Sequence, residues 1–302
     1  MTSQLHALPA TAARTRVQRG APPGMKWEMW RRTPLPALRN AVIELWAGFE
    51  PGSSARHRVL PNGEVSLMLQ IGAAQRLIEH DGMRHDALLK GAFVSGLQER
   101  PGTFESMAPM SVVSARLTPL GAWIVLGGLP QAELAQRVID IADLLPACAG
   151  FSELSERCSE LNDLGEALDL LEHWLLARML SPAAPQPHAA TQLATACLHT
   201  RPQLAIAAIA KTCAVSERRL HELFLREVGL SPKRLARILR FRRALQVLAD
   251  APHRDLRDVA LSCGYYDQPH LYRDFRALAQ MTPVEYIARL GQALDGADVL
   301  PG

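Results

Sequence analysis

A short stretch near residue 270 carries side chains of the kinds that bind nucleic acid. These side chains are Gln268, Pro269, His270, Tyr272, Arg273 and Arg276. Arginine pairs bidentately with guanine, while histidine and tyrosine hydrogen-bond base edges or phosphates. We interpret the stretch as a helix face that enters the major groove of duplex DNA, with Arg276 at a phosphate. An ordinary solvated helix face is the alternative, because short basic helices are common.

A second stretch, near residue 220, repeats the pattern. Its outward side chains are Arg218, Arg219, His221, Glu222 and Arg226. Among them, Glu222 has a carboxylate that can accept a hydrogen bond from cytosine N4. Apolar positions recur 50 residues later before the turn and 51 residues later after it, so the second turn is one residue longer. Two copies of one unit are therefore present, which favours the DNA-binding interpretation.

Helical periodicity and capping residues predict that each copy is a helix-turn-helix. In the second copy, the apolar faces are formed by Leu256, Val259, Ala260 and Cys263, and then by Leu271, Phe275 and Leu278. Asp255 and Asp267 are expected to cap the two helices, and Gly264 to end the first where a positive φ is needed. In the first copy, Ser216 is the expected N-cap and Gly229 follows the second helix. Residues 231–250, with apolar positions at helical spacing among six basic side chains, predict a helix that connects the copies.

Spaced identities in this region resemble the AraC/XylS transcriptional regulators. The matching residues are Arg240, Ala244 and Leu248; then Gly264, Tyr265, Asp267, His270, Leu271, Arg273 and Phe275; and finally Thr282, Pro283 and Tyr286. The resemblance implies an all-helical DNA-binding domain over residues 189–290, made of two helix-turn-helix units and a connecting helix. Gln280 departs from the family pattern, which usually has glycine there, and this departure concerns the local turn geometry.

Length and composition indicate a soluble protein of two domains. The chain has 302 residues, 48% apolar and 21% charged, with no apolar run of about 18 residues that would span a membrane. Residues 1–24 lack the apolar core of a secretory signal, so we expect a flexible tail and a cytoplasmic location. Residues 201–290 hold 16 basic against 9 acidic side chains, whereas the rest of the chain holds 17 against 21. The nucleic-acid half is therefore expected at residues 201–290.

Residues 25–130 are predicted to form a β-rich sandwich or barrel, so the expected fold class is α+β. Short apolar or alternating runs between turn residues predict strands at 42–46, 65–71, 77–79, 93–97, 103–107 and 112–117. The segments 57–64, 96–98 and 119–122 resemble the N-terminal domain of a poorly characterised subgroup of AraC-like regulators. This region is expected to sense a small molecule.

Neither a metal site nor a cofactor is indicated. Five cysteines lie far apart without a C-x-x-C pair, which favours buried packing: Cys148, Cys158, Cys197, Cys213 and Cys263. His57, His80 and His85 lack the tight His-x-His spacing and carboxylate of a barrel metal site. Four tryptophans would line an apolar pocket or, more commonly, fill a core: Trp27, Trp30, Trp46 and Trp123.

From residue 131 to residue 180 the apolar period becomes helical. One stripe consists of Leu134, Val138, Ile141, Leu144 and Leu145, and another of Leu164, Leu168, Leu171, Leu175 and Met179. Such helices either pair with a second copy of the chain or pack on the β-rich region. Residues 181–188 are the expected Pro/Ala linker and domain boundary, and residues 291–302 the expected C-terminal tail.

These patterns support a sequence-specific transcription regulator whose two units bind successive major-groove segments. Double-stranded DNA and a small-molecule effector are the expected partners, and a second copy of the chain and RNA polymerase are further candidates. One alternative is a β-barrel enzyme on a DNA-binding tether, although the sequence has no nucleophile elbow, phosphate loop, HExxH motif or clustered carboxylates. Another is an architectural DNA binder, which would not require the acidic N-terminal half.

Overall fold

The computed structural model describes residues 28–50, 56–80, 83–107, 109–144, 150–161, 163–290 and 299–301. The tail expected at residues 1–24 lies outside these residues, and so do Trp27, Leu145 and Cys148. The side chain of His85 is also outside the description.

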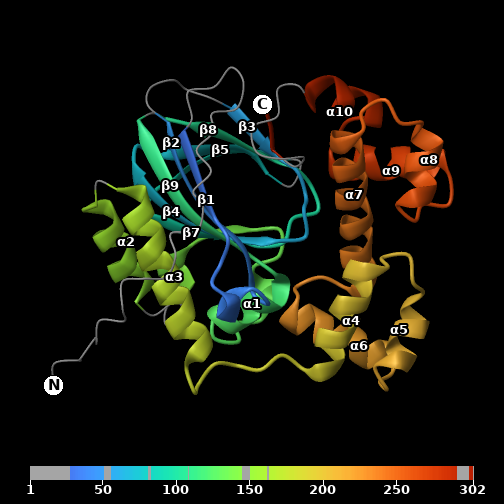
Figure 1. The fold of residues 1–302 in the computed structure, drawn as a ribbon, viewed down its shortest axis with the longest axis horizontal. Coiled ribbons are helices and arrows are strands. Elements are labelled where there is room, and N and C mark those ends of the chain that lie inside the picture. Colours follow the sequence, from blue (N-terminus) through green and yellow to red (C-terminus); the bar gives the residue numbers. More distant parts are fainter. Residues whose placement is uncertain are drawn as a thin grey trace.

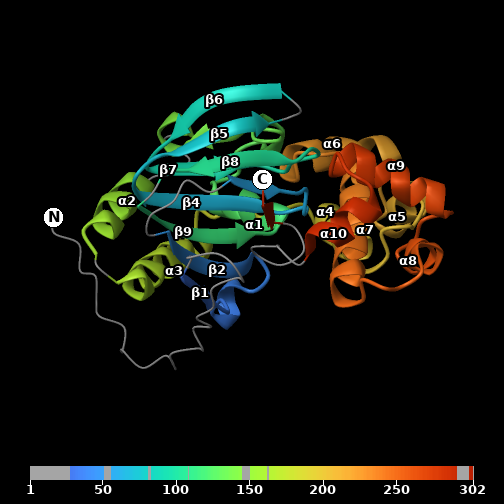
Figure 2. The ribbon, with the colours of Figure 1, turned by 90° about the horizontal axis from the view of Figure 1, so that it is seen from above.

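Within the described residues, the N-terminal half contains two antiparallel sheets (Figures 1 and 2). The first sheet runs in the order β1 (Glu28–Arg32), β2 (Val42–Glu50), β9 (Met110–Leu117), β4 (Val65–Gly72), β7 (Ala92–Ser95) and β10 (Val138–Asp140). The second runs in the order β11 (Val299–Pro301), β3 (Arg56–Val59), β8 (Gly102–Ser106), β5 (Gln75–His80) and β6 (Met83–Leu89). The expected α+β class with a β-rich N-terminal half is confirmed.

Successive side chains along a strand point to opposite faces of the sheet, so the two faces of the first sheet pack against different layers. Leu45, Ala115 and Leu67 lie in one cross-strand row and belong to the main buried core. This face is covered by α2 (Phe151–Ser159) and α3 (Leu164–Leu180), which pack on the sheet (Figure 1). The neighbouring row faces the second sheet, and there Trp46 and Met68 remain partly exposed although their strands are internal. These two side chains are therefore not fully buried between the sheets.

The helix expected along the stripe from Leu134 to Leu145 was wrong. Its described part forms a 3-10 turn η2 (Gln131–Glu133), strand β10 and a second 3-10 turn η3 (Ile141–Leu144). Gln136 has a φ of 63°, which interrupts a helix, and β10 pairs with the edge strand β7. Pairing satisfies backbone groups on both strands, which an isolated amphipathic turn cannot do. The second stripe does form a helix, α3, and its own sheet buries Leu168, Leu171 and Leu175.

The C-terminal half is helical. It consists of α4 (Ala189–Thr200), α5 (Ile206–Thr212), α6 (Glu217–Glu227), α7 (Pro232–Asp250), α8 (Leu256–Ser262), α9 (Gln268–Leu278) and α10 (Pro283–Leu290). The long helix α7 joins the two groups of shorter helices (Figure 1), and its apolar face, including Leu235, Phe241 and Leu248, is fully buried. Among the described helices, none is both long and apolar enough to cross a membrane.

Several segments of the sheet half contact the helical half, and two of them are the loop before β4 and strand β11. Gly63, in the loop before β4, lies so close to α7 that an added Cβ would be 3.3 Å from Leu239. The next residue, Glu64, is buried and forms ion pairs with Arg116 at 2.5 Å and Arg242 at 2.6 Å. Residues 299–301, expected in the tail, instead form β11 and pair with β3. The chain thus returns from α10 to the second sheet.

Candidate nucleic-acid interface

The second predicted unit is formed by α8 and α9. The Asp255 carboxylate accepts a hydrogen bond from the Arg257 N–H at 2.7 Å, and Asp267 accepts one from the His270 N–H at 2.7 Å. Between the helices, Gly264 has a φ of 85°. The two caps and the positive φ confirm the local predictions. These features set the angle at which α9 leaves the turn.

The first unit, α5 and α6, has the same construction. The Ser216 hydroxyl accepts from the Arg219 N–H at 3.1 Å, and Gly229, with a φ of 89°, follows α6. Leu220 and Phe224 are buried and form the inward face of α6. The turn in the second unit is one residue longer than in the first. Both units present their second helix against the same connecting helix α7.

The candidate DNA-binding side chains of α9 lie on its solvent-facing side. Pro269, Arg273 and Arg276 are exposed, and Gln280 continues the same stripe past the helix end. The other predicted residues, Gln268, His270 and Tyr272, are partly buried. The His270 ring packs edge-on against Tyr265, with 5.1 Å between ring centroids, so this contact orients the imidazole.

The candidate residues of α6 divide into two groups. Arg218, Arg219, His221 and Glu222 are exposed on one side, and Glu222 forms ion pairs with Arg218 at 3.2 Å and Arg219 at 3.5 Å. Such exposed pairs are weak, so these groups can exchange partners. Arg226 instead places its guanidinium 5.7 Å from the centre of the Trp123 ring and 2.7 Å from Glu227. Arg226 therefore contacts the sheet half as well as solvent.

Asp274, on the inner side of α9, was not singled out from the sequence. Its carboxylate is buried and accepts a hydrogen bond from Arg237 of α7 at 2.7 Å, with Arg240 at 3.9 Å. Beside it, burial raises the pKa of Tyr265, and the Asp274 charge adds to that increase. Tyr265 keeps its ring under the Arg240 guanidinium at 5.5 Å. The pair of Asp274 and Arg237 thus joins α9 to α7.

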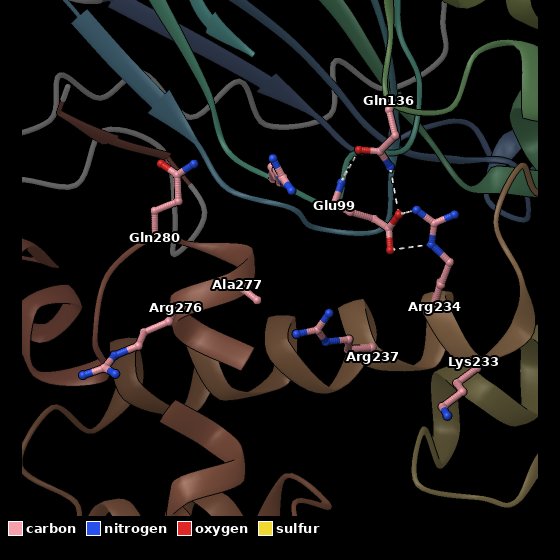
Figure 3. A pocket seen from close by; sticks show the side chains of 9 residues that line it. Glu99, Gln136, Lys233, Arg234, Arg237, Arg276, Ala277 and Gln280 are labelled. Carbon is pink, nitrogen blue, oxygen red and sulfur yellow. Dashed lines mark hydrogen bonds and ion pairs between the residues drawn. The ribbon is translucent and has the colours of Figure 1, made fainter. Parts of the chain in front are cut away.

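Two exposed features also went unrecognised. Tyr266, in the turn before α9, is 88% exposed, and an aromatic side chain beside the capping Asp267 was the available signal. An open cleft of about 750 Å³ lies between α7, α9 and the sheet half (Figure 3). The cleft combines residues more than one hundred positions apart, so sequence spacing does not reveal it.

The histidines weighed as metal ligands have protein partners. His57 Nε2 lies 2.9 Å from the Ser106 hydroxyl, and His80 Nε2 lies 2.8 Å from the Gln98 side-chain oxygen. Within the described part of the chain, no group of three or more His, Cys, Asp or Glu side chains is arranged to hold a metal ion.

The cysteines differ in burial. Burial raises the pKa of Cys158 to about 11 and also raises the pKa of Cys263. Cys213, expected at the position equivalent to Cys263, is only partly buried. The prediction of buried packing therefore holds for Cys158 and Cys263 but not fully for Cys197 and Cys213, which are partly buried.

Comparison with protein families matches both halves of the chain. A helix-turn-helix domain matches residues 209–289, and a domain of unknown function matches residues 31–140. The first match covers both units and the helix that connects them. The chain is therefore a DNA-binding protein of the helix-turn-helix class. Residues 209–289 form a helix-turn-helix domain of the AraC type.

Solved structures with a similar arrangement are distant. ToxT from Vibrio cholerae O395 is 12% identical, with a TM-score of 0.43 over 78% of this chain and 96% of that chain. ToxT bound to (E)-4-(8-methylnaphthalen-1-yl)but-3-enoic acid is 11% identical, with a TM-score of 0.46 over 79% and 98%. A Chromobacterium violaceum regulator with an AraC-type DNA-binding domain is 28% identical over 34% of this chain and 93% of that chain, with a TM-score of 0.32. Among curated proteins, nothing matches the chain.

Proposed function

We propose that this regulator binds DNA through both units at once, with α6 and α9 in successive major-groove segments. The main observation that supports this proposal is that one helix, α7, connects two units of the same construction. Its 19 residues give a length of about 28 Å at 1.5 Å per residue. That length is comparable with the roughly 34 Å between major-groove segments on one side of a duplex.

The reading residues are assigned by their chemistry and exposure. Arg218, His221 and Glu222 of the first unit, and His270, Tyr272 and Arg273 of the second, are proposed to contact bases. Arg219, Gln268 and Pro269 would contact the adjoining backbone or base edges, and Arg276 a phosphate. Arg226 is the weakest member of the set, because it already contacts Trp123 and Glu227.

Footprinting of the full chain on duplexes selected from a random pool tests this function. Two protected major-groove segments one helical turn apart are expected, with affinity that falls steeply as salt rises. A single protected segment would mean that only one unit binds bases. The absence of any selected sequence would contradict sequence-specific binding as a whole.

We further propose that residues 25–130 sense a small molecule, with 131–180 as a connector, 181–188 as a linker and 189–290 as the DNA-binding domain. Trp46 and Met68 are partly exposed on the face of the first sheet that is directed toward the second sheet. A polar cluster in the same β-rich region is buried: Glu50 Oε2 lies 3.9 Å from His57 Nε2, and Ser106 is fully buried. These groups favour an effector with an aromatic or apolar body and a polar substituent.

A chain of alternating charges supports coupling between the two halves. Arg116, on β9, lies 3.5 Å from Glu44 and 2.5 Å from Glu64. Glu64 in turn lies 2.6 Å from Arg242 of α7. A ligand that moves Arg116 would change how Glu64 holds α7, since buried charge pairs depend steeply on geometry.

Reciprocal binding measurements test the coupling. A molecule found by thermal-shift screening of the full chain should change operator affinity by about 5- to 150-fold, and operator should change its affinity equally. Glu64→Gln should reduce that factor, whereas Glu153→Gln on α2 should not. Equal ligand affinity with and without operator would leave the sheet half without an allosteric role for that ligand.

The two alternative functions are separated by direct assays. An architectural DNA binder would protect DNA without sequence preference. An enzyme on a DNA-binding tether would turn over a substrate in a metabolite screen. Neither alternative requires an ion-paired carboxylate such as Glu64 between the halves, whereas a ligand-controlled regulator uses it directly.

A further inference from the structure

The cleft in Figure 3 lies where the two halves of the chain meet. It is lined by Glu99, Arg100, Gln136, Lys233, Arg234, Arg237, Arg276, Ala277 and Gln280. The first three come from the sheet half, the next three from the first turns of α7, and the last three from α9 and its end. The cleft therefore runs alongside the helix that connects the two units.

The lining is strongly basic. Five of its side chains are cationic and one, Glu99, is anionic. Arg237 is already paired with Asp274 at 2.7 Å. Lys233 and Arg276 are exposed, and within the described residues neither side chain forms a hydrogen bond or an ion pair, although Arg276 interacts electrostatically with Glu285. A surface with this excess of positive charge attracts a polyanion.

The cleft is continuous with the proposed reading face. Pro269, Arg273, Arg276 and Gln280 form the exposed stripe of α9, and the last two also line the cleft. At the other end, Lys233 and Arg234 lie in the first turn of α7, which Ser231 caps and which begins a short turn after the end of α6. A duplex in contact with both units would carry its backbone past these residues between the two major-groove segments.

In the free protein, Glu99 forms an ion pair with one of the cationic side chains, Arg234. Arg234 Nε donates to Glu99 Oε1 at 2.7 Å, and the second guanidinium nitrogen contacts the other carboxylate oxygen. Gln136 holds this carboxylate in place, because its side-chain oxygen accepts from the Glu99 N–H at 2.9 Å and its NH₂ donates to Glu99 Oε2 at 3.3 Å. A bidentate carboxylate uses the same guanidinium edge that a phosphate would use.

We propose that this cleft is a third DNA contact that both halves of the chain share. Backbone phosphates bind Lys233, Arg234 and Arg276 there, with Arg100 as a phosphate ligand from the sheet half. Phosphate displaces Glu99 from Arg234, so Glu99 competes with DNA in the free protein. This inference rests on the proposed function, because it requires DNA to lie across both units.

The test compares the full chain with single variants on duplexes that the wild-type chain has selected. Anisotropy titrations between 50 and 200 mM salt measure affinity and its salt dependence. Arg100→Gln should make the slope of log affinity against log salt concentration about 0.9 less steep. Between 50 and 200 mM salt, the affinity of this variant should therefore fall by a factor about 3.5-fold smaller than that of the wild-type chain. Glu99→Gln should tighten binding by up to about fivefold, because the Arg234 side of the ion pair is exposed to water. In an Arg234→Gln background, Glu99→Gln should have no effect on DNA binding.

Controls on α2 carry the same charge changes far from the cleft. Arg157→Gln is the control for Arg100→Gln, and Glu153→Gln is the control for Glu99→Gln. Arg157 and Glu153 are exposed on α2, which lies at the opposite side of the sheets (Figure 1). Variants that behave like their controls would overturn the cleft assignment while leaving the major-groove contacts intact. If the wild-type chain does not bind duplex DNA, the proposed function itself is wrong.

A titration with pyrophosphate at constant ionic strength separates DNA from a small anion. If Arg100→Gln weakens pyrophosphate binding but leaves DNA binding at the control value, the cleft is a small-anion site and the DNA assignment is wrong. Weaker binding of DNA by Arg100→Gln, together with tighter binding by Glu99→Gln, supports the assignment.

Discussion

The two helix-turn-helix units share their helices and caps but place their glycines at opposite ends. In the turn, the first unit has Ala214 at a φ of 53° where the second has Gly264 at 85°. After the second helix, the first unit has Gly229 at 89° and the second has Gln280 at 56°. Each unit therefore holds one non-glycine residue in the left-handed region. In both turns the positive φ accompanies a local closing hydrogen bond, Val215 N–H to Ala210 O at 3.1 Å and Tyr265 N–H to Ala260 O at 2.9 Å. Glycine is not required for this conformation and only makes it less costly.

The units also differ in where they bury a carboxylate. Asp274 of the second unit aligns with Leu223 of the first, and both are buried. Conversely, Glu227 of the first unit is fully buried where the second has Leu278. Glu227 accepts from the His188 N–H at 2.9 Å, before α4, whereas Asp274 binds α7. One acid thus anchors the first unit to its entering segment, and the other anchors the second unit to the connecting helix.

The reading faces carry opposite charges at one aligned position. Glu222 in the first unit corresponds to Arg273 in the second, and both are exposed. A carboxylate accepts from cytosine, while a guanidinium donates to guanine. The two units are therefore expected to read different half-sites, so the operator should not be a simple direct repeat.

The largest expected effect concerns the anchor of the second unit. Asp274→Ala should lower the free energy of unfolding by about 3 kcal/mol, because it removes the partner of Arg237 and leaves a cavity. This is the lower end of the usual range, since the Arg237 side chain is 37% exposed and can be rehydrated. Urea unfolding of Asp274→Ala and the wild-type chain measures this loss in the free energy of unfolding. The double variant Asp274→Leu with Arg237→Leu, in which residue 274 matches the buried Leu223 of the first unit, should recover most of the loss. A loss below about 1 kcal/mol for Asp274→Ala would contradict the anchor.

The next effect concerns the charge difference on the reading faces. Arg273→Ala should weaken binding to selected duplexes by about 1 to 3 kcal/mol and relax the preference at one base pair. Glu222→Ala should relax one position but strengthen binding to random duplexes, because it removes a negative charge. Competition titrations with selected and random DNA measure both. Equal losses on both kinds of DNA for Arg273→Ala would remove it from the base contacts.

The glycine difference predicts a smaller effect. Ala214→Gly should stabilise the chain by about 1 kcal/mol, because it relieves the left-handed strain at an exposed position. Gln280→Gly should stabilise the full chain by less, since the Gln280 side chain accepts a hydrogen bond from Arg58. In an Arg58→Gln background, the two glycine substitutions should give similar gains in melting temperature. Lower melting temperatures for Ala214→Gly would show that strain at this position is negligible.

The smallest effect concerns the hydroxyl of Tyr265, which aligns with Val215 in the first unit. This hydroxyl is buried and has no hydrogen-bond partner among the described residues. Tyr265→Phe should therefore raise the free energy of unfolding by about 0.5 kcal/mol at neutral pH.

The pH dependence of the same variant provides a second measurement. Burial raises the pKa of Tyr265 in the folded chain, so the folded state keeps a proton that the unfolded state loses above about pH 10. Wild-type stability should therefore fall more than that of Tyr265→Phe as pH rises from 9 to 11. Parallel curves would place the hydroxyl in contact with water.

Local sequence patterns predicted much of the secondary structure. The strands expected at 42–46, 65–71 and 112–117 lie inside β2, β4 and β9, because alternation and turn residues are local signals. The caps Ser216, Asp255 and Asp267 form as predicted, because each depends only on residues within one turn. The same local signals identified the repeated unit and, with it, the DNA-binding class.

Long-range contacts decided the rest. Strands β10 and β11 form because the edges of distant strands pair with them, and their short sequences carry no comparable signal. Burial of Glu64 against Arg242 and the meeting of Glu99 with Arg234 depend on how the two halves pack. The sequence thus determines which helices and strands can form and which side chains can read DNA. The tertiary structure decides which charges are paired, because the free energy of a pair depends on the distance between residues far apart in the chain.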